Sequence, residues 1–349
     1  MNAKRFFITA LAAVLVCLGC VAGFVAWAQP TVIAGPLQAG ETGLFVNERY
    51  EMAGLIRNQD YSAVLMGTSL TANYRASWFT EGTGKETLKI TFPDGWIREF
   101  DRALDLVWET HPDVDAVYFC MDPNILLRSD SQRAVELPEY LYNRNPIDDV
   151  QFYLNADALL LAAETVAARK AGTAVDLDSA YIWDGNYWFH REQALRFYQR
   201  PARSETVLPA DAYYPMCAEN LAVIKSWVEE HPDTQFTVWF PPYSVLYWDK
   251  MEREGKTEAV ISAVEYAVGE LLAYDNVNVH CFLIAYNIIQ TLNHYTDHIH
   301  CSGEVTQWCA GEVLAGRWHF TEENYRIRLD ELRSFVANYD YEALFPEEE

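Results

Sequence analysis

Short apolar runs of strand length, separated by longer segments with a helical apolar period, constrain the fold of this chain most. Five such runs lie at 62–66, 88–92, 114–121, 235–240 and 277–283. Helices are predicted at 47–58, 96–110, 148–169, 217–230, 245–254, 258–273, 303–315 and 321–338. Strands that alternate with helices are typical of a mostly parallel sheet covered on both faces. The pattern therefore predicts an α/β domain.

Length and charge limit what this domain can be. The chain has 349 residues, half of them hydrophobic, which is enough for one large domain or two ordinary ones. Its formal net charge is −24. A protein this acidic repels phosphate backbones, so we exclude nucleic acid as a partner.

The N-terminal segment 1–28 has the composition of a membrane anchor. Lys4 and Arg5 precede 23 uncharged residues, Phe6 to Ala28, which are enough to cross a bilayer. The positive flank predicts an N-terminus in the cytoplasm and a domain outside, held at the cell membrane by a single helix. Ala26-Trp27-Ala28 resembles a signal-peptidase site, so secretion after cleavage near Ala28 is the alternative.

The remaining sequence divides into four parts. Residues 29–46 are rich in Gly and Pro and are expected to form a spacer outside the core. The α/β domain is expected to cover 47–340, with an aromatic insertion at about 172–212 that packs over the sheet edge. Residues 341–349 form an acidic tail.

A small hydroxyl-bearing turn follows the first strand. The apolar run ends at Gly67, Thr68 and Ser69 follow, and the pattern then becomes helical through Trp78 and Phe79. Ser69 therefore stands at a helix start, where free backbone N–H groups favour an anion. Two interpretations fit this position: a helix N-cap, or a nucleophile whose oxyanion those N–H groups would bind.

The densest polar cluster, residues 294–300, follows the last strand and so lies at the same carboxyl edge of the sheet as Ser69. Asp297 and His300 are three residues apart, so the carboxylate can orient the imidazole through Nδ1 and leave Nε2 to take a proton from a serine. Two alternatives remain: a metal site in which His294 and His298 join these two residues, and a purely structural His-rich turn.

Together these two segments resemble the SGNH (GDSL-like) hydrolase superfamily. Gly67-Thr68-Ser69-Leu70 is similar to its first block, and Asp297-His298-Ile299-His300 is similar to its last, Asp-x-x-His. The resemblance covers roughly 47–340 and implies a flavodoxin-like three-layer α/β/α sandwich. It also implies that Ser69 is the nucleophile, His300 the general base and Asp297 the residue that orients it.

The resemblance also implies an oxyanion hole. Its donors would be the backbone N–H groups of Ser69 and Gly95, with a third from the segment after the third strand. There Asp122 stands where the family has Asn, and an ionised carboxylate cannot donate. Either Asn124 supplies the donor, or Asp122 is protonated, or only backbone groups donate. Thr68 likewise replaces the Asp that usually precedes the nucleophile.

A further turn, Pro241-Pro242-Tyr243-Ser244, ends a strand at the same edge and is either a substrate loop or a plain turn. We expect Asp122, Tyr243 and Ser244 to contact substrate. The resemblance and the anchor together predict a serine-dependent acyl-ester hydrolase or O-acyltransferase that acts on an acylated small molecule or a cell-envelope glycan, without a metal or cofactor. The alternative is a catalytically inactive domain of this type that binds glycan or a partner in an envelope assembly.

Overall fold

The computed structural model describes residues 2–38, 40–129 and 137–345, which form two compact units. Unit 1 comprises Met1–Asp60, Arg102–Pro112 and Val135–Tyr181. Unit 2 comprises Tyr61–Asp101, Asp113–Ala134 and Ile182–Glu349. The predicted domain 47–340 is therefore divided between the two units. Positions 346–349 of the predicted acidic tail lie outside the described residues.

Unit 2 contains a six-stranded, mostly parallel sheet within the described residues. Its strands are β1 (Ala63–Gly67), β2 (Thr87–Thr91), β3 (Ala116–Cys120), β4 (Gln235–Phe240), β5 (Val277–Cys281) and β6 (His319–Phe320). Their order is β2-β1-β3-β4-β5-β6; the first five pair in parallel, and β6 pairs antiparallel to β5. The mixed α/β class and the five parallel strands agree with the sequence prediction. The two-residue β6 was not predicted, because so short a strand leaves no periodic pattern.

The carboxyl ends of β1 and β3 lie side by side. Chain order moves from β1 outward to β2 in one direction and from β3 to β5 in the other, so the sheet changes direction between β1 and β3. The register pairs Gly67 with Cys120, the last residues of these strands. The loops that follow them therefore start together, at the point where open α/β sheets bind ligands.

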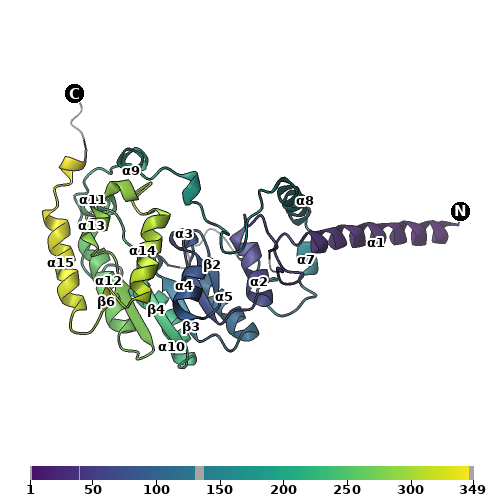
Figure 1. Cartoon of the computed structure of the whole chain (residues 1–349), viewed down its shortest axis with the longest axis horizontal. Coiled ribbons are helices and arrows are strands. Elements are labelled where there is room, and N and C mark those ends of the chain that lie inside the picture. The colour runs from purple at the N-terminus through teal and green to yellow at the C-terminus, as the bar shows by residue number, and fades with distance from the viewer. Residues whose placement is uncertain (1, 39, 130–136, 346–349) are drawn as a thin grey trace. The chain divides into compact units, whose positions relative to one another are not determined.

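The helices of unit 2 pack in two groups. In one group α10 (Tyr214–Glu230), α12 (Thr257–Leu271) and α15 (Tyr325–Asn338) contact one another in sequence; in the other, α4 (Ala76–Thr83) contacts α14 (Gly303–Leu314). The other helices of this unit are α3 (Ser69–Ala72), α6 (Pro123–Leu126), α9 (Arg191–Phe197), α11 (Val245–Arg253) and α13 (Tyr286–Ile289), and α5 (Ile97–Thr110) runs through both units. Figure 1 shows the strands of this unit among its helices.

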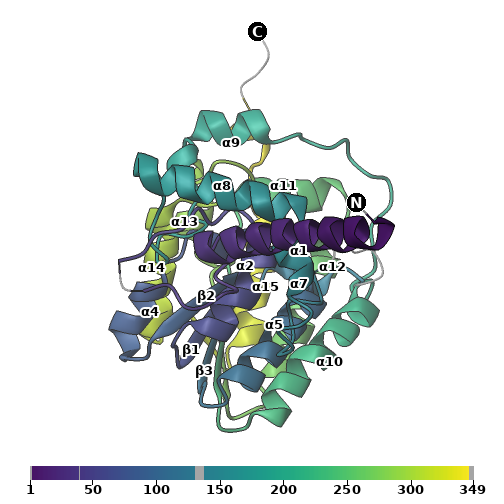
Figure 2. The same ribbon diagram turned by 90° about the vertical axis from the view of Figure 1, so that its right-hand side faces the viewer.

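Unit 1 is helical in its described part. It contains α1 (Ala3–Ala28), α2 (Glu48–Asn58), α7 (Val150–Tyr153) and α8 (Ala156–Ala171). α7 and α8 both contact α1 and lie beside its C-terminal end (Figure 1 and Figure 2). The single helix predicted at 148–169 is divided because Asn155 caps α8: its side chain accepts a 2.8 Å hydrogen bond from the backbone N–H of Asp157.

The segment 29–46 differs from the expected spacer, because part of it is buried in unit 1. Thr31, Val32 and Phe45 are at most 6% exposed. The Asn58 side chain donates a 2.8 Å hydrogen bond to the carbonyl of Val32. A Cβ on Gly54 would lie only 2.2 Å from the carbonyl oxygen of Thr31, so the chain passes too close to α2 for any larger residue there. The expectation that this segment lies outside the core was wrong.

The helix α1 is long and apolar enough to cross a membrane, by its length and composition. Residues 3–20 are exposed throughout, whereas Val25 and Ala28 are buried against unit 1. A cleavable signal sequence would meet the same criteria.

Candidate functional site

The turn after β1 positions Ser69. Gly67 is required there, since a Cβ on it would lie 2.1 Å from Thr71 Oγ1 and 2.7 Å from the carbonyl oxygen of Cys120. Thr68 is the N-cap of α3, and Ser69 is the first residue of that helix. The helix predicted to continue through Phe79 breaks after Ala72, so α3 is a single turn. Such a short helix has only a small dipole, so the nearby backbone N–H groups are what Ser69 gains from its position.

Three polar side chains predicted from the sequence form a continuous chain of hydrogen bonds. Ser69 Oγ lies 2.9 Å from His300 Nε2. His300 Nδ1 lies 2.7 Å from Asp297 Oδ2 on its other side. All three side chains are partly exposed, so a solute can reach them. With its proton on Nδ1, facing the carboxylate, the imidazole offers its Nε2 lone pair to the Ser69 hydroxyl.

The turn at 297–300 keeps this carboxylate ionised. Asp297 Oδ1 accepts 2.8 Å hydrogen bonds from the backbone N–H groups of Ile299 and His300, while Oδ2 faces the imidazole. Burial acts to raise the pKa of Asp297, but the hydrogen bond and charge of His300 and the two backbone donors outweigh it and lower the pKa to about 2. The carboxylate is therefore charged at neutral pH.

Trp183 contacts two members of this hydrogen-bond chain, Ser69 and His300, and the sequence pattern did not place it there. Its indole N–H donates a 3.0 Å hydrogen bond to the carbonyl of Ser69. Its ring stands edge-to-face with His300, at a centroid distance of 5.2 Å. The backbone N–H groups of Trp183 and Asp184 both donate to Asn73 Oδ1, at 3.0 and 3.1 Å. The only sequence signal was the aromatic density of the insertion 172–212.

Asp122 lies at the centre of a second, buried polar network. Its Oδ1 accepts from the backbone N–H of Asn124 at 2.8 Å and from the phenol of Tyr243. Its Oδ2 accepts from Thr68 Oγ1 at 3.3 Å, so the network reaches the residue that precedes Ser69. The Asn124 amide in turn donates to the Tyr243 hydroxyl at 3.2 Å. The structure therefore joins Asp122, Asn124 and Tyr243 in one cluster beside the turn.

The residues predicted to contact substrate, Asp122, Tyr243 and Ser244, are buried and support the turns of the site instead. Tyr243 and Ser244 are 0% exposed and Asp122 is 6% exposed. Burial raises the pKa of Asp122, although its hydrogen bonds from Tyr243 and Asn124 oppose the rise. Ser244 Oγ donates a 2.8 Å hydrogen bond to the carbonyl of His298 and so joins the 297–300 turn to the start of α11. The predicted role in substrate contact does not agree with this burial.

Gly95 lies in the loop after β2, where Arg128 and Phe100 contact it. Its carbonyl accepts a 2.9 Å hydrogen bond from Arg128, and a Cβ on it would meet the carbonyl of Phe92 at 2.7 Å and the ring of Phe100 at 2.8 Å. The Arg128 guanidinium also lies 4.2 Å from the centre of the Trp96 ring. These contacts order the loop after β2, which begins beside the end of β1, since the backbone N–H of Phe92 donates a 3.1 Å hydrogen bond to the carbonyl of Gly67.

The histidines of the 294–300 cluster have separate neighbours. The ring of His298 lies parallel to Tyr247 at 6.5 Å and also contacts Tyr198, whereas His300 faces Ser69. Burial lowers the pKa of His298. Within the described ranges, no group of three or more His, Cys, Asp or Glu side chains is arranged to hold a metal ion.

Comparison with known proteins finds no family model that matches the chain and no curated protein that matches its sequence.

Proposed function

We propose that unit 2 carries a serine-dependent acyl-ester hydrolase or O-acyltransferase of SGNH type, with Ser69 as the nucleophile. One observation carries the proposal: the hydrogen-bond chain from Asp297 through His300 to Ser69, 2.7 and 2.9 Å long. A Ser–His–Asp chain is recognised by this geometry and by the roles of its members, whatever their order in the sequence. The position of Ser69 adds support, since it follows β1, whose last residue, Gly67, pairs with Cys120 at the end of β3.

The reaction follows from the positions of the protons. Ser69 Oγ attacks the carbonyl carbon of the ester while its proton passes to His300 Nε2. The tetrahedral intermediate then expels the alcohol, which takes that proton from the imidazolium, and an acyl group remains on Ser69. Water or a sugar hydroxyl attacks this acyl-enzyme in the same way, which gives hydrolysis or transfer. Asp297 stays ionised and stabilises the imidazolium.

The donors for the oxyanion are assigned to the backbone N–H of Ser69 and the side-chain amide of Asn124. Asp122 already accepts hydrogen bonds from Thr68, Tyr243 and Asn124, so it acts here as an acceptor that holds the turn. The Asn124 amide has two N–H groups and uses one on Tyr243, so the other is free for an oxyanion. A backbone N–H from Gly95 is the remaining member implied by the family resemblance.

The aromatic residues beside His300 favour a glycan as the acceptor. Trp183 contacts His300, and the ring of Tyr187 stands 5.4 Å from that of Trp183. Tyr187 is 51% exposed, which leaves part of an aromatic ring open to solvent, and only Trp183 stands between it and the base. Sugar rings stack on aromatic faces while their hydroxyls remain hydrated.

The fold and location belong to the same proposal. The strand order β2-β1-β3-β4-β5 is that of flavodoxin-like sheets, and the two groups of packed helices are what a three-layer α/β/α sandwich requires. We assign α1 as a membrane anchor, with Lys4 and Arg5 in the cytoplasm and both units outside. An envelope substrate fits this location. Protease treatment of intact cells would test it, since a shielded domain would reverse the orientation.

A fluorophosphonate probe tests the chemistry directly, because it reacts with activated serines. The detergent-solubilised full chain is expected to label at Ser69, and labelling should be lost in Ser69→Ala and His300→Ala. Ser204→Ala is the matched control, since the hydroxyl of this exposed serine bonds to the nearby backbone of Thr206 and should not affect labelling. Labelling of Ser69→Ala protein at the wild-type rate would refute the assignment.

One observation favours the second candidate, an inactive domain that binds glycan. Asp122 stands where the family has an amide donor, and its buried carboxylate accepts hydrogen bonds instead of donating one to an oxyanion. The probe separates the two functions. If the folded wild-type chain binds glycan but is not labelled by the probe, the second candidate, the inactive glycan-binding domain, is the function.

A further inference from the structure

The length of α1 exceeds what the bilayer needs. A hydrocarbon core of about 30 Å takes roughly 20 helical residues at 1.5 Å each. Counted from Phe6, the first residue after the charged Lys4 and Arg5, such a span reaches Val25. Unit 1, however, already packs on α1 from Val21 onward, and Val25 is 0% exposed. About five residues, 21–25, or roughly 7 Å of helix, are therefore at membrane depth and partly covered by protein.

The helices α7 and α8 cover this part of α1. Both helices contact α1 and flank its end (Figure 1 and Figure 2). Arg169, in the last turn of α8, fixes the junction: its guanidinium donates 2.7 Å hydrogen bonds to the carbonyls of Ala28 and Thr42. A cation bonded to the last carbonyls of a helix also favours its dipole. The helices α7 and α8 therefore lie at the level where α1 leaves the bilayer.

α7 and the residues on either side of it present apolar side chains outward at this level: Ile147 in the preceding turn, Val150 in the helix and Leu154 at its C-cap. Ile147, Val150 and Leu154 are 76%, 48% and 41% exposed. Their spacing of three and four residues puts them in one row, and the backbone N–H of Val150 bonds to the carbonyl of Ile147. Trp27, at the end of α1, is 69% exposed. Apolar rows and tryptophans that face outward at a membrane boundary are typical of surfaces in contact with lipid.

We propose that this row, Ile147, Val150 and Leu154, is embedded in the interfacial layer of the bilayer and forms a second membrane contact beside α1. The inference rests on the anchor role of α1 in the proposed function. The chain carries a net charge of −24, so electrostatic attraction to anionic lipids cannot hold the surface there. The contact is hydrophobic and is expected to persist at high salt.

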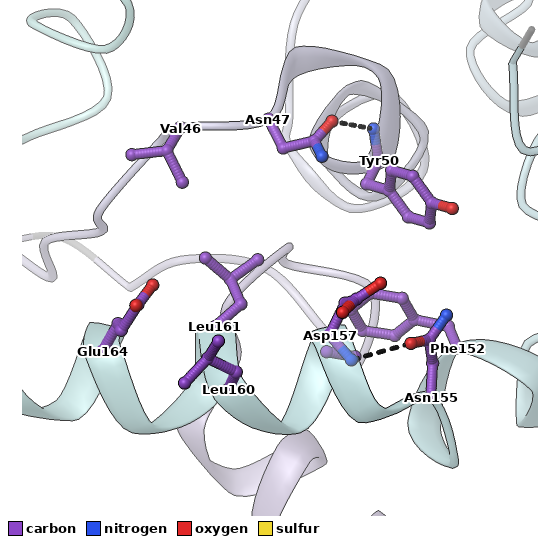
Figure 3. A pocket seen from close by; sticks show the side chains of 10 residues that line it. Val46, Asn47, Tyr50, Phe152, Asn155, Asp157, Leu160, Leu161 and Glu164 are labelled. Atoms are coloured by element: carbon purple, nitrogen blue, oxygen red, sulfur yellow. Dashed lines mark hydrogen bonds between the residues drawn. The ribbon is translucent and has the colours of Figure 1, made fainter.

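A neighbouring groove in unit 1 shows where the lipid contact stops. It lies between α8 and the segment 46–50 and has a volume of about 250 Å³ (Figure 3). Leu160 and Val46 face it, but so do the carboxylates of Asp157 and Glu164. Charged groups are costly to bury in lipid, so this face of α8 stays in water. The groove thus supplies an exposed apolar residue, Val46, 57% exposed, as a matched control in the same unit.

Site-directed fluorescence in the full chain tests the contact. Cys17 and Cys20 are replaced by Ser; the other five cysteines are buried, which raises their thiol pKa values and protects them from labelling. An environment-sensitive NBD group is then attached at Val150→Cys, Val46→Cys or, within the span, Leu15→Cys. Each protein is reconstituted in phosphatidylcholine vesicles and quenched with either aqueous iodide or doxyl-labelled phosphatidylcholine.

The proposal expects the Val150 probe to lose iodide quenching and to be quenched by doxyl lipid, at low and high salt alike, with the reverse at Val46. A Val150 probe open to iodide would overturn it. A Val150 probe shielded from both quenchers would also overturn it, because protein and not lipid would then cover the row. The Leu15 probe separates this failure from that of the anchor: if doxyl lipid does not quench it, α1 is not in the bilayer and the location in the proposed function fails.

Discussion

Asp297→Asn tests whether the proposed base depends on the carboxylate. Asn has the shape of Asp, and its Oδ1 can keep both 2.8 Å hydrogen bonds from the backbone N–H groups of Ile299 and His300. Its Nδ2 then takes the place of Oδ2, 2.7 Å from His300 Nδ1. Because this amide group only donates, Nδ1 must accept, and the imidazole proton moves to Nε2. That proton faces Ser69 Oγ, so the ring can no longer act as a base.

The expected loss in the rate of fluorophosphonate labelling is about 10⁴-fold, the size found for the equivalent change in serine proteases, or about 5 kcal/mol of activation free energy. The measurement is the second-order labelling rate at neutral pH. Asp211→Asn, a change at an exposed carboxylate, is the control and should label as the wild type does. A folded Asp297→Asn protein that labels within about tenfold of the wild type would refute the reasoning, since tenfold is only about 1.4 kcal/mol.

The stability of the same variant depends on pH in a defined direction. The folded-state pKa of Asp297 is depressed from 3.8 to about 2, so its contribution is present above pH 3.8 and is lost as the pH falls through about 2. A shift of this size corresponds to roughly 2 kcal/mol at neutral pH. Urea unfolding should therefore show the wild type more stable than Asp297→Asn at pH 7, and the difference should shrink below about pH 4.

Two further substitutions test the supports of the turn. Tyr243→Phe removes a donor to the buried carboxylate of Asp122 and should lower the free energy of unfolding by about 2 kcal/mol at pH 7. The loss should be smaller in acid, because the pKa of Asp122 is raised above its ordinary value of 3.8 and the carboxyl is mostly protonated below that pH. Urea unfolding at pH 7 and at about pH 3.5 measures both. Gly67→Ala puts a Cβ 2.1 Å from Thr71 Oγ1 and should abolish fluorophosphonate labelling, whereas Gly311→Ala, with open space around it in α14, should stabilise by about 0.5–1 kcal/mol. Labelling by Gly67→Ala at the wild-type rate would contradict the close packing of this turn.

The sequence was sufficient to place the strands and the loops that follow them. Residues 235–240 form β4 as predicted, and the other four parallel strands differ from their predicted runs by one or two residues at the ends. A strand that is buried on both faces is mostly apolar, so the run gives its approximate limits even where a polar residue such as Lys89 interrupts it. Segments that follow parallel strands begin at one edge of the sheet. The order of strands and polar turns, together with the family resemblance, therefore paired Ser69, just after β1, with the 297–300 turn, the polar segment between β5 and α14.

The residues that support this pair could not be found in the same way. Trp183 is 114 residues from Ser69, and Tyr243 is 121 residues from Asp122, yet each pair is joined by a hydrogen bond. No periodicity links positions so far apart, since such contacts depend on how loops from different strands fold over one another. Tyr243 was singled out because it follows a strand, but its burial, and with it the change from substrate contact to support, depends on its neighbours.

The segment 29–46 shows most clearly how tertiary packing overrides a local pattern. Its Gly and Pro content is that of a linker, and Val32 and Phe45 have φ angles of 59° and 47°, in the left-handed region that side chains with a Cβ rarely adopt. Each such residue costs of order 1–3 kcal/mol, so it persists only where the surrounding contacts fix it. Both side chains are buried, at 1% and 6% exposure, and burying such a residue contributes about 1.5–3 kcal/mol. The two terms are of similar size, so the backbone conformation holds only while these side chains stay buried, and composition alone could not show that.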